Sequence, residues 1–175
     1  MPRTLIVYST TDGQTLKICQ RLRQAIEASG SQAHIVSVAD AGGVDLGTYD
    51  KIVVGASIRY GRHSKAIREF VDARTDQLSA KPNAFFSVNI VARKSDKNRP
   101  ETNPYLRKFL ERTRWQPGLL AVFAGKLDYP RYRFLDRLMI RFIMLITRGP
   151  TDPRAIVEFT DWNEVEAFGR RVAQM

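Results

Sequence analysis

The chain has 175 residues, of which 43% are hydrophobic, so it can bury the core of one domain without staples. Its single cysteine, Cys19, excludes an internal disulfide and a cysteine-based zinc site, and only two histidines remain as other ligands, so we expect no metal. The apolar run at the N-terminus is too short and too early for a signal peptide. We therefore expect a protein of the reducing cytoplasm.

The net charge of +10 indicates an anionic partner, which could be a nucleic acid, an acidic membrane face or an acidic ligand. The charge is concentrated, because residues 93–149 contain 14 Lys and Arg against 5 Asp and Glu. The rest of the chain is nearly neutral. The sequence thus predicts one strongly basic region on a neutral scaffold.

Apolar runs and apolar residues at helical spacing alternate along the chain. Strands are expected at 4–8, 34–38, 51–56, 84–91 and 119–124. Helices are expected after Thr15 as far as Ser29-Gly30, at about 64–78, at about 104–114, and after Asp161, a predicted N-cap. Cys19 lies on the inward stripe of the first helix, which favours a core role over a redox role.

This alternation predicts an α/β fold, with five parallel strands in one sheet covered by helices on both faces. We expect one domain over residues 1–175. Residues 126–150 interrupt the alternation as a basic helical insertion between the fifth strand and the last helix.

The loop after the first strand, Ser9–Thr15, contains four hydroxyl side chains and a glycine, and it opens into a helix. Parallel sheets bind ligands outside the carboxyl ends of their strands, and helix N-termini attract phosphate. The loop therefore predicts a cradle for a phosphate monoester, with simple helix capping as the alternative.

Several nucleotide-binding and signalling classes are excluded. The loop has neither GxxxxGK[ST] nor GxGxxG, which excludes a P-loop enzyme and the standard dinucleotide fingerprint. The third strand ends in Gly55-Ala56-Ser57 with no aspartate, which excludes a receiver domain.

The hydroxyl-rich loop resembles the phosphate loop of flavodoxins, with Asp12 where a second threonine is usual. A narrower resemblance is carried by VGASIRYG at 54–61, by SVN at 87–89 with VARK at 91–94, and by YPRYR at 129–133. These segments resemble the quinone-dependent protoporphyrinogen IX dehydrogenases of bacterial haem synthesis, and the similarity runs along essentially the whole chain.

This resemblance implies a flavodoxin-like fold with FMN as the cofactor. Its phosphate would be held by Thr10, Thr11, Asp12, Gly13, Gln14 and Thr15. Its ring would be bordered by two loops, Ser57, Ile58, Arg59, Tyr60 and Gly61 after the third strand and Asn89, Ile90, Val91, Ala92 and Arg93 after the fourth. Gly61 suits a positive φ or a close approach of the backbone to a ligand. Tyr60 could stack on the ring or pack beneath the loop.

The implied activity is the oxidation of protoporphyrinogen IX to protoporphyrin IX, with electrons passed through FMN to a membrane quinone, menaquinone or ubiquinone. Arg59, Arg62 and Arg93 are candidates for binding the substrate's propionates, since guanidinium groups match carboxylates, although solvated surface arginines are the alternative. His63 could relay a proton, although a structural role is the plainer interpretation. The sequence shows no paired carboxylates and no nucleophilic triad, which agrees with chemistry carried by a cofactor.

The insertion contains RYRFLDRLMIRFIMLIT at 131–147, in which Arg133, Arg137 and Arg141 form one helical stripe beside a broad apolar face. Its charge-free apolar run is far shorter than the roughly 20 residues of a spanning helix. The pattern predicts a helix lying in an anionic membrane surface, with Tyr105, Tyr129 and Tyr132 as further anchors. A helix docked on the domain's own core is the alternative. The expected location is peripheral, on the cytoplasmic face of the bacterial inner membrane.

Two alternative functions remain. One is a general FMN-dependent quinone reductase that takes electrons from a nicotinamide cofactor. The other is a soluble flavodoxin-type electron carrier, which the net charge of +10 disfavours. We expect no nucleic-acid partner, because the basic region has no recognisable motif for one.

Overall fold

The computed structural model describes residues 1–175 and contains a five-stranded parallel sheet in the order β2-β1-β3-β5-β6. The strands are β1 (Arg3–Ser9), β2 (Gln32–Ser37), β3 (Lys51–Arg59), β5 (Asn83–Val88) and β6 (Leu119–Phe123). A short strand, β4 (Arg62–His63), forms an antiparallel hairpin with the end of β3. The predicted parallel sheet is confirmed.

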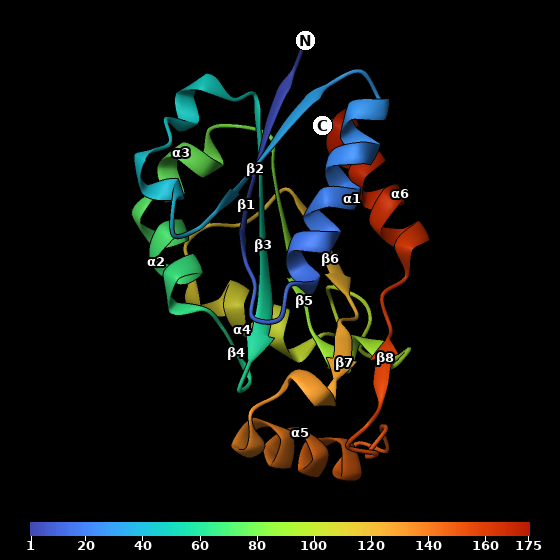
Figure 1. Cartoon of the computed structure of the whole chain (residues 1–175). Helices are drawn as coiled ribbons and strands as arrows, with labels where there is room; N and C mark the ends of the chain where they lie inside the picture. The colour runs from blue at the N-terminus through green and yellow to red at the C-terminus, as the bar shows by residue number, and fades with distance from the viewer.

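Helices cover both faces of this sheet (Figure 1). One face carries α1 (Gln14–Ala28) and α6 (Trp162–Gln174), and the other carries α2 (Lys65–Ala73), α3 (Thr75–Ser79) and α4 (Pro104–Arg112). Short 3₁₀ turns lie at Ala41–Gly43, Leu46–Thr48, Ile90–Arg93 and Tyr129–Arg131. Phe85 and Phe86, adjacent in β5, point into opposite cores because successive side chains of a strand alternate between faces. Cys19 is fully buried between α1 and the sheet, as predicted for a core residue.

Three predicted boundaries differ from the structure. The strand expected at 84–91 ends at Val88, because Asn89 caps a 3₁₀ turn through its side chain. The helix expected at 64–78 is broken at Arg74, whose ψ of 18° is not helical. The third strand continues three residues beyond Ala56, so the segment after it is a hairpin and not a free loop.

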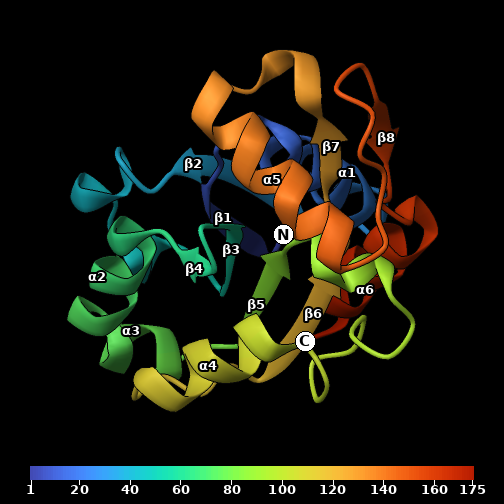
Figure 2. The ribbon, with the colours of Figure 1, turned by 90° about the horizontal axis from the view of Figure 1, so that it is seen from below.

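The insertion is held to the domain by a second, small sheet. Its first strand, β7 (Lys126–Asp128), pairs with β8 (Ile156–Glu158), so the inserted unit extends past the expected end at Pro150. Between them lies α5 (Phe134–Ile146), which crosses beneath the carboxyl ends of the parallel strands (Figures 1 and 2). The main sheet therefore positions the loops after β1, β3 and β5 directly above the insertion.

A separate core holds α5 in place. Leu127, Tyr129, Tyr132 and Met144 are its buried members, and Ile90 from the main domain packs against them. Tyr129 is fully buried and donates a hydrogen bond from its hydroxyl to the carbonyl of Pro150 at 2.7 Å. The prediction that Tyr129 and Tyr132 anchor the protein in a membrane surface is therefore wrong, because both close the insertion's own core.

Candidate functional site

The site begins at the turn from β1 into α1, where the helix has no side-chain cap. Gly13 is the N-cap with φ of 89°, a left-handed conformation that favours glycine. The other long helices of the main domain are capped by the side chains of Ser64, Asn103 and Asp161. Simple capping therefore does not explain the hydroxyls of this loop, and the first N–H groups of α1 stay available for a ligand.

Two hydroxyl groups at this turn are buried without a hydrogen-bond partner, Ser9 Oγ and Thr15 Oγ1. An unpartnered buried hydroxyl is unfavourable unless a ligand satisfies it. Thr10 Oγ1 accepts a hydrogen bond from the N–H of Gly13 at 3.0 Å, which shapes the turn, and Thr11 is exposed. Free N–H groups and orphaned hydroxyls at one helix start fit a phosphate group.

Gln14 has a different partner from the one its sequence position suggests. Its side-chain amide is buried and donates to Glu158 Oε1 at 3.0 Å and to Thr160 Oγ1 at 2.9 Å. Its side chain thus fixes the strand β8, and only its backbone N–H remains for a phosphate.

Asp12 connects the loop with the insertion. Its carbonyl accepts a hydrogen bond from the Arg131 guanidinium at 3.4 Å. Desolvation raises the pKa of the Asp12 carboxyl, and the charges of Arg59 and Arg131 oppose that rise. The candidate phosphate turn is therefore bordered by cations from β3 and from the insertion.

The hairpin after β3 contacts α5. Tyr60 and Gly61 both have positive φ, 50° and 72°, as a two-residue hairpin turn of this type requires. Arg59 Nη2 forms an ion pair with Asp136 Oδ2 of α5 at 2.7 Å, and the Tyr60 hydroxyl bonds to the other carboxylate oxygen. The Arg59 guanidinium also lies 5.3 Å from the centroid of the Tyr60 ring, within the range of a cation–π contact. Ser57 and Ile58 are half-buried behind this contact.

The turn after β5 is shaped by Asn89. Its Oδ1 accepts from the N–H of Ala92 and from Asn103 Nδ2, both at 3.0 Å, and its Nδ2 donates to Ser87 Oγ at 3.1 Å. Asn89 and Ala92 are buried, whereas Ile90 and Val91 are half-buried. The Asn89 side chain therefore sets the course of 89–93 from within the fold.

The three arginines expected to bind substrate are not gathered into one cluster. Arg59 is paired with Asp136, and Arg93 Nη2 donates to the carbonyl and the hydroxyl of Thr147 at 3.0 Å, next to the end of α5. Burial lowers the pKa of Arg93. Arg62 is exposed and forms no ion pair.

His63 is buried in the core among aromatic side chains. It is 6% exposed, its Nε2 lies 2.8 Å from Ser87 Oγ, and its ring meets Phe85 and Phe109 edge-on. Burial, aided by the charge of Arg68, lowers the pKa of His63 to about 3. The ring is therefore neutral at physiological pH, which agrees with the structural interpretation of this residue and not with a proton relay.

Sequence reasoning missed the contacts that the insertion makes with the site. Asp136, Thr147 and Glu158 each hold a side chain that was expected to face a ligand. Only Asp136 carried a signal, as the sole acidic residue of a basic helix.

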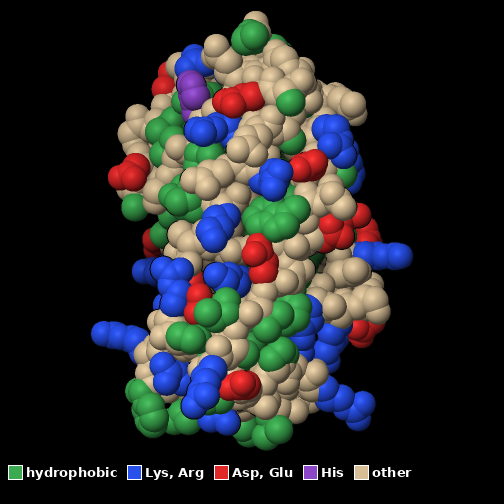
Figure 3. Space-filling view, turned by 45° about the vertical axis from the view of Figure 1, so that its right-hand side comes forward, with side chains coloured by type: hydrophobic (Ala, Val, Ile, Leu, Met, Phe, Trp, Pro, Cys, Tyr) green, Lys and Arg blue, Asp and Glu red, His purple; other side chains and the backbone are tan.

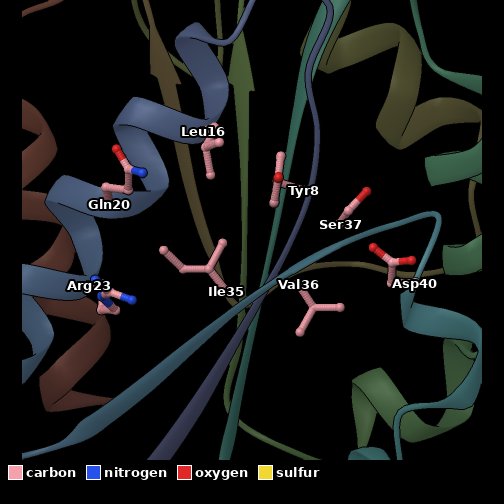
Figure 4. A pocket seen from close by; sticks show the side chains of 8 residues that line it. All are labelled: Tyr8, Leu16, Gln20, Arg23, Ile35, Val36, Ser37 and Asp40. Carbon is pink, nitrogen blue, oxygen red and sulfur yellow. The ribbon is translucent and has the colours of Figure 1, made fainter.

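A groove of about 400 Å³ lies between α1 and the edge strand β2 (Figure 4). Tyr8, Ile35 and Arg23 are among the side chains that line it. None of the expected site residues borders it, so it does not belong to the candidate site.

Comparison with known proteins agrees with this architecture. A family model described as "Flavodoxin domain" matches residues 5–154. The two-electron reduced flavodoxin of Megasphaera elsdenii has a TM-score of 0.54, with 13% identity over 98% of this chain and 99% of that one. The fold and the phosphate-type turn thus define a flavodoxin-domain protein.

Two curated relatives identify the family within the flavodoxin-domain proteins. The protoporphyrinogen IX dehydrogenase [quinone] of Escherichia coli K12 is 46% identical over 173 residues, covering 99% of this chain and 96% of its own. The protein of the same name from Leishmania major is 45% identical over 175 residues, covering 99% and 76%. The chain belongs to the quinone-dependent protoporphyrinogen IX dehydrogenase family of flavodoxin-domain proteins.

Proposed function

We propose that the chain is an FMN-dependent oxidoreductase that converts protoporphyrinogen IX to protoporphyrin IX and passes the electrons to a membrane quinone, in haem biosynthesis. The observation that carries this proposal is the 46% identity to the E. coli dehydrogenase over 99% of the chain. That alignment includes the insertion as well as the sheet domain. The inserted segment is therefore common to the two chains.

The residues present fit FMN. The uncapped start of α1 and the hydroxyls of Thr15 and Ser9 would hold the phosphate. The hairpin 57–61 and the turn 89–93 would border the ring, because they follow neighbouring strands at the carboxyl edge of the sheet. When bound, FMN supplies the hydride acceptor and the redox link between the two substrates.

The chain's own contribution is orientation and enclosure. Asn89 fixes the turn after β5, and the Arg59–Asp136 ion pair holds α5 beneath the hairpin. This closes one side of the site with protein and limits the entry of water. We assign His63 a structural role, since it is buried against Phe85 and Phe109 and burial lowers its pKa.

The alternative of a quinone reductase fed by a nicotinamide cofactor shares the same flavin site. It differs in the electron donor. A flavodoxin-type carrier would need no helix beneath the flavin loops, and the charge of +10 also disfavours it. The basic region contains no recognisable nucleic-acid motif, so we propose no such partner.

We also propose that α5 attaches the protein to an anionic membrane surface, on the cytoplasmic face of the bacterial inner membrane. Eight of the eleven exposed large hydrophobic residues lie on α5, and Leu135 is 75% exposed. Figure 3 shows these apolar side chains at the end of the molecule, among lysines and arginines. A broad apolar face rimmed by cations matches the interface of an anionic bilayer. No helix is long and apolar enough to cross a bilayer.

The arginine stripe of α5 lies closer to the domain than expected. Arg133 is exposed, but Arg137 is half-buried and donates to the carbonyl of Tyr132 at 3.3 Å. Arg141 Nε donates to the carbonyl of Thr151 at 2.9 Å. The helix is thus docked along one edge through Met144, as the docked alternative predicted, and its remaining face is exposed, as the proposed membrane attachment requires.

The deciding experiment uses the purified protein under anaerobic conditions. Its absorption spectrum and released cofactor should identify FMN. Protoporphyrinogen should be converted to fluorescent protoporphyrin when a quinone is added, and NADH or NADPH should not reduce the bound flavin. Flavin reduction by a nicotinamide cofactor, without oxidation of protoporphyrinogen, would establish the reductase instead.

A further inference from the structure

We infer that a basic pocket between β4, α2 and α4 binds the carboxylates of the porphyrinogen substrate. It is defined by Arg62, Arg68, Lys108 and Arg112, with Gly61, His63, Tyr105 and Phe109 completing its wall. This inference rests on the proposed function and identifies where the substrate's charged groups are held.

The charge of the pocket is unbalanced. Four of its eight lining residues are cations and none is acidic. None of the four has a carboxylate within ion-pair distance, since the ion pairs of the structure involve other residues. Cations clustered without counter-charges repel one another, so the pocket is complementary to an anion.

One of these cations has an unmet hydrogen bond. Arg68 Nε is buried and has no partner. Arg68 lines the pocket together with the buried His63. A carboxylate that enters the pocket would accept a hydrogen bond from this N–H group. Its negative charge would also offset the repulsion among the four cations.

The pocket is large enough only for an end group of a larger molecule. Its volume is about 30 Å³, which is far below the few hundred Å³ of a site for a whole cofactor or macrocycle. The tetrapyrrole would stay outside, with only its propionate ends reaching the cations.

The position of the pocket connects it with the flavin loops. Gly61 belongs both to the hairpin expected to border the flavin and to the pocket wall. In Figures 1 and 2, β4 lies between α4 and α5 at the end of the molecule that carries the site. The register of the hairpin places Arg59 opposite Arg62; Asp136 neutralises Arg59 and leaves Arg62 unpaired. The pocket is therefore a cationic site beside these loops whose cations form no ion pair within the protein.

The test compares Lys108→Gln/Arg112→Gln with Arg107→Gln. Arg107 is exposed on the same helix but does not line the pocket, so its replacement shows the effect of removing one positive charge from α4 outside the pocket. Binding of protoporphyrin IX and of its dimethyl ester is measured by fluorescence with the flavin-loaded protein in a non-ionic detergent. Sedimentation with anionic vesicles is measured in parallel.

The wild type should bind the free acid at least about tenfold more tightly than the ester, the change expected for one charge-assisted hydrogen bond. The double variant should lose this preference and keep its vesicle binding, while Arg107→Gln should resemble the wild type. Equal acid binding by the double variant and the wild type would overturn the inference. So would a loss of vesicle binding alone, which would assign the pocket to lipid phosphate. Failure of the proposed function has another signature, since the wild type would then not oxidise protoporphyrinogen in the quinone assay.

Discussion

Arg59 at the end of β3 and Asp136 in α5 are 77 residues apart in the sequence and form an ion pair of 2.7 Å. Tyr60 bonds to the same carboxylate, so one acidic side chain joins two residues of the candidate flavin hairpin to the insertion. This contact decides which arginines near the site are free. It also adds an ion pair to the apolar core that holds α5 in place.

Replacing Asp136 by Asn should loosen α5 without unfolding the domain. The ion pair to Arg59 is partly exposed, and exposed ion pairs add little to global stability. Amide hydrogen exchange in α5 should therefore become faster, while exchange in the central strands stays the same. Unchanged exchange in α5 would show that its small core holds it alone. Glu164→Gln, on α6 and far from the hairpin in sequence, is the control.

The same contact should survive mild acidification. The hydrogen bond from Tyr60 and the charge of Arg59 lower the pKa of Asp136. A carboxyl whose pKa is lowered by folding keeps its stabilising contact above its ordinary pKa of 3.8 and loses it only as the pH falls further. Hydrogen exchange in α5, corrected for intrinsic rates, should be the same at pH 7 and pH 5. Release of α5 between these two values would contradict the ion pair.

Thr15→Val should weaken FMN binding. The buried Thr15 hydroxyl has no partner in the protein, and a hydrogen bond to a charged group is worth about 1.5–3 kcal/mol, or about 10- to 100-fold in affinity. The flavin-free protein should lose no stability, since the change removes an unsatisfied polar group. Fluorescence titration with FMN measures the affinity, and denaturation of the flavin-free protein measures the stability.

Thr4→Val is the matched control for this change. Thr4 also has a buried, unpartnered hydroxyl, but it lies near the start of β1, away from the phosphate turn. FMN affinity should stay at the wild-type value in this variant. Equal effects of the two substitutions would remove the phosphate assignment from Thr15.

His63 should make folding stability depend on pH. Its pKa is about 3 in the folded protein against 6.5 in the unfolded chain, so the unfolded state binds a proton first as the pH falls. The free energy of unfolding should therefore decrease below pH 6.5 by up to about 1.4 kcal/mol per pH unit from this group. His63→Gln should flatten this slope in urea titrations between pH 6.5 and 4. A slope unchanged by His63→Gln would contradict the buried neutral ring.

The triple change Leu135→Gln/Phe142→Gln/Ile146→Gln should abolish binding to anionic vesicles. These side chains are 62–75% exposed, so the fold should be little affected. High salt should release the wild type only partly, because the apolar contribution is not screened. Sedimentation with vesicles measures binding, and flavin absorbance reports on the fold. Ile156→Gln, an exposed apolar residue outside α5, should bind as the wild type does; lipid binding by the triple variant would exclude α5 as the attachment.

The sequence by itself determined the layered architecture. The central strands β1, β3 and β5 are apolar runs that are largely buried, and the covering helices repeat apolar residues at helical spacing, so both patterns are local. Gly13 and the hydroxyls around it also predicted a phosphate site at a turn where the structure leaves the helix start without a side-chain cap. The break in the helix at Arg74 and the end of β5 at Val88 were not predicted. Arg74 bonds to the carbonyls of Val44 and Gly42 in a distant segment, and the Asn89 side chain caps the turn that follows β5.

Only the tertiary structure decided which site residues are free. Gln14, Arg59 and Arg93 carry the groups that a phosphate or a carboxylate needs, yet Glu158, Asp136 and Thr147 already occupy them. The strand β8 has three residues and no apolar alternation of its own, so its pairing with β7 leaves no periodic signal. Contacts between segments that are far apart in the sequence depend on how the insertion folds back onto the domain. The local spacing of residues therefore does not predict them.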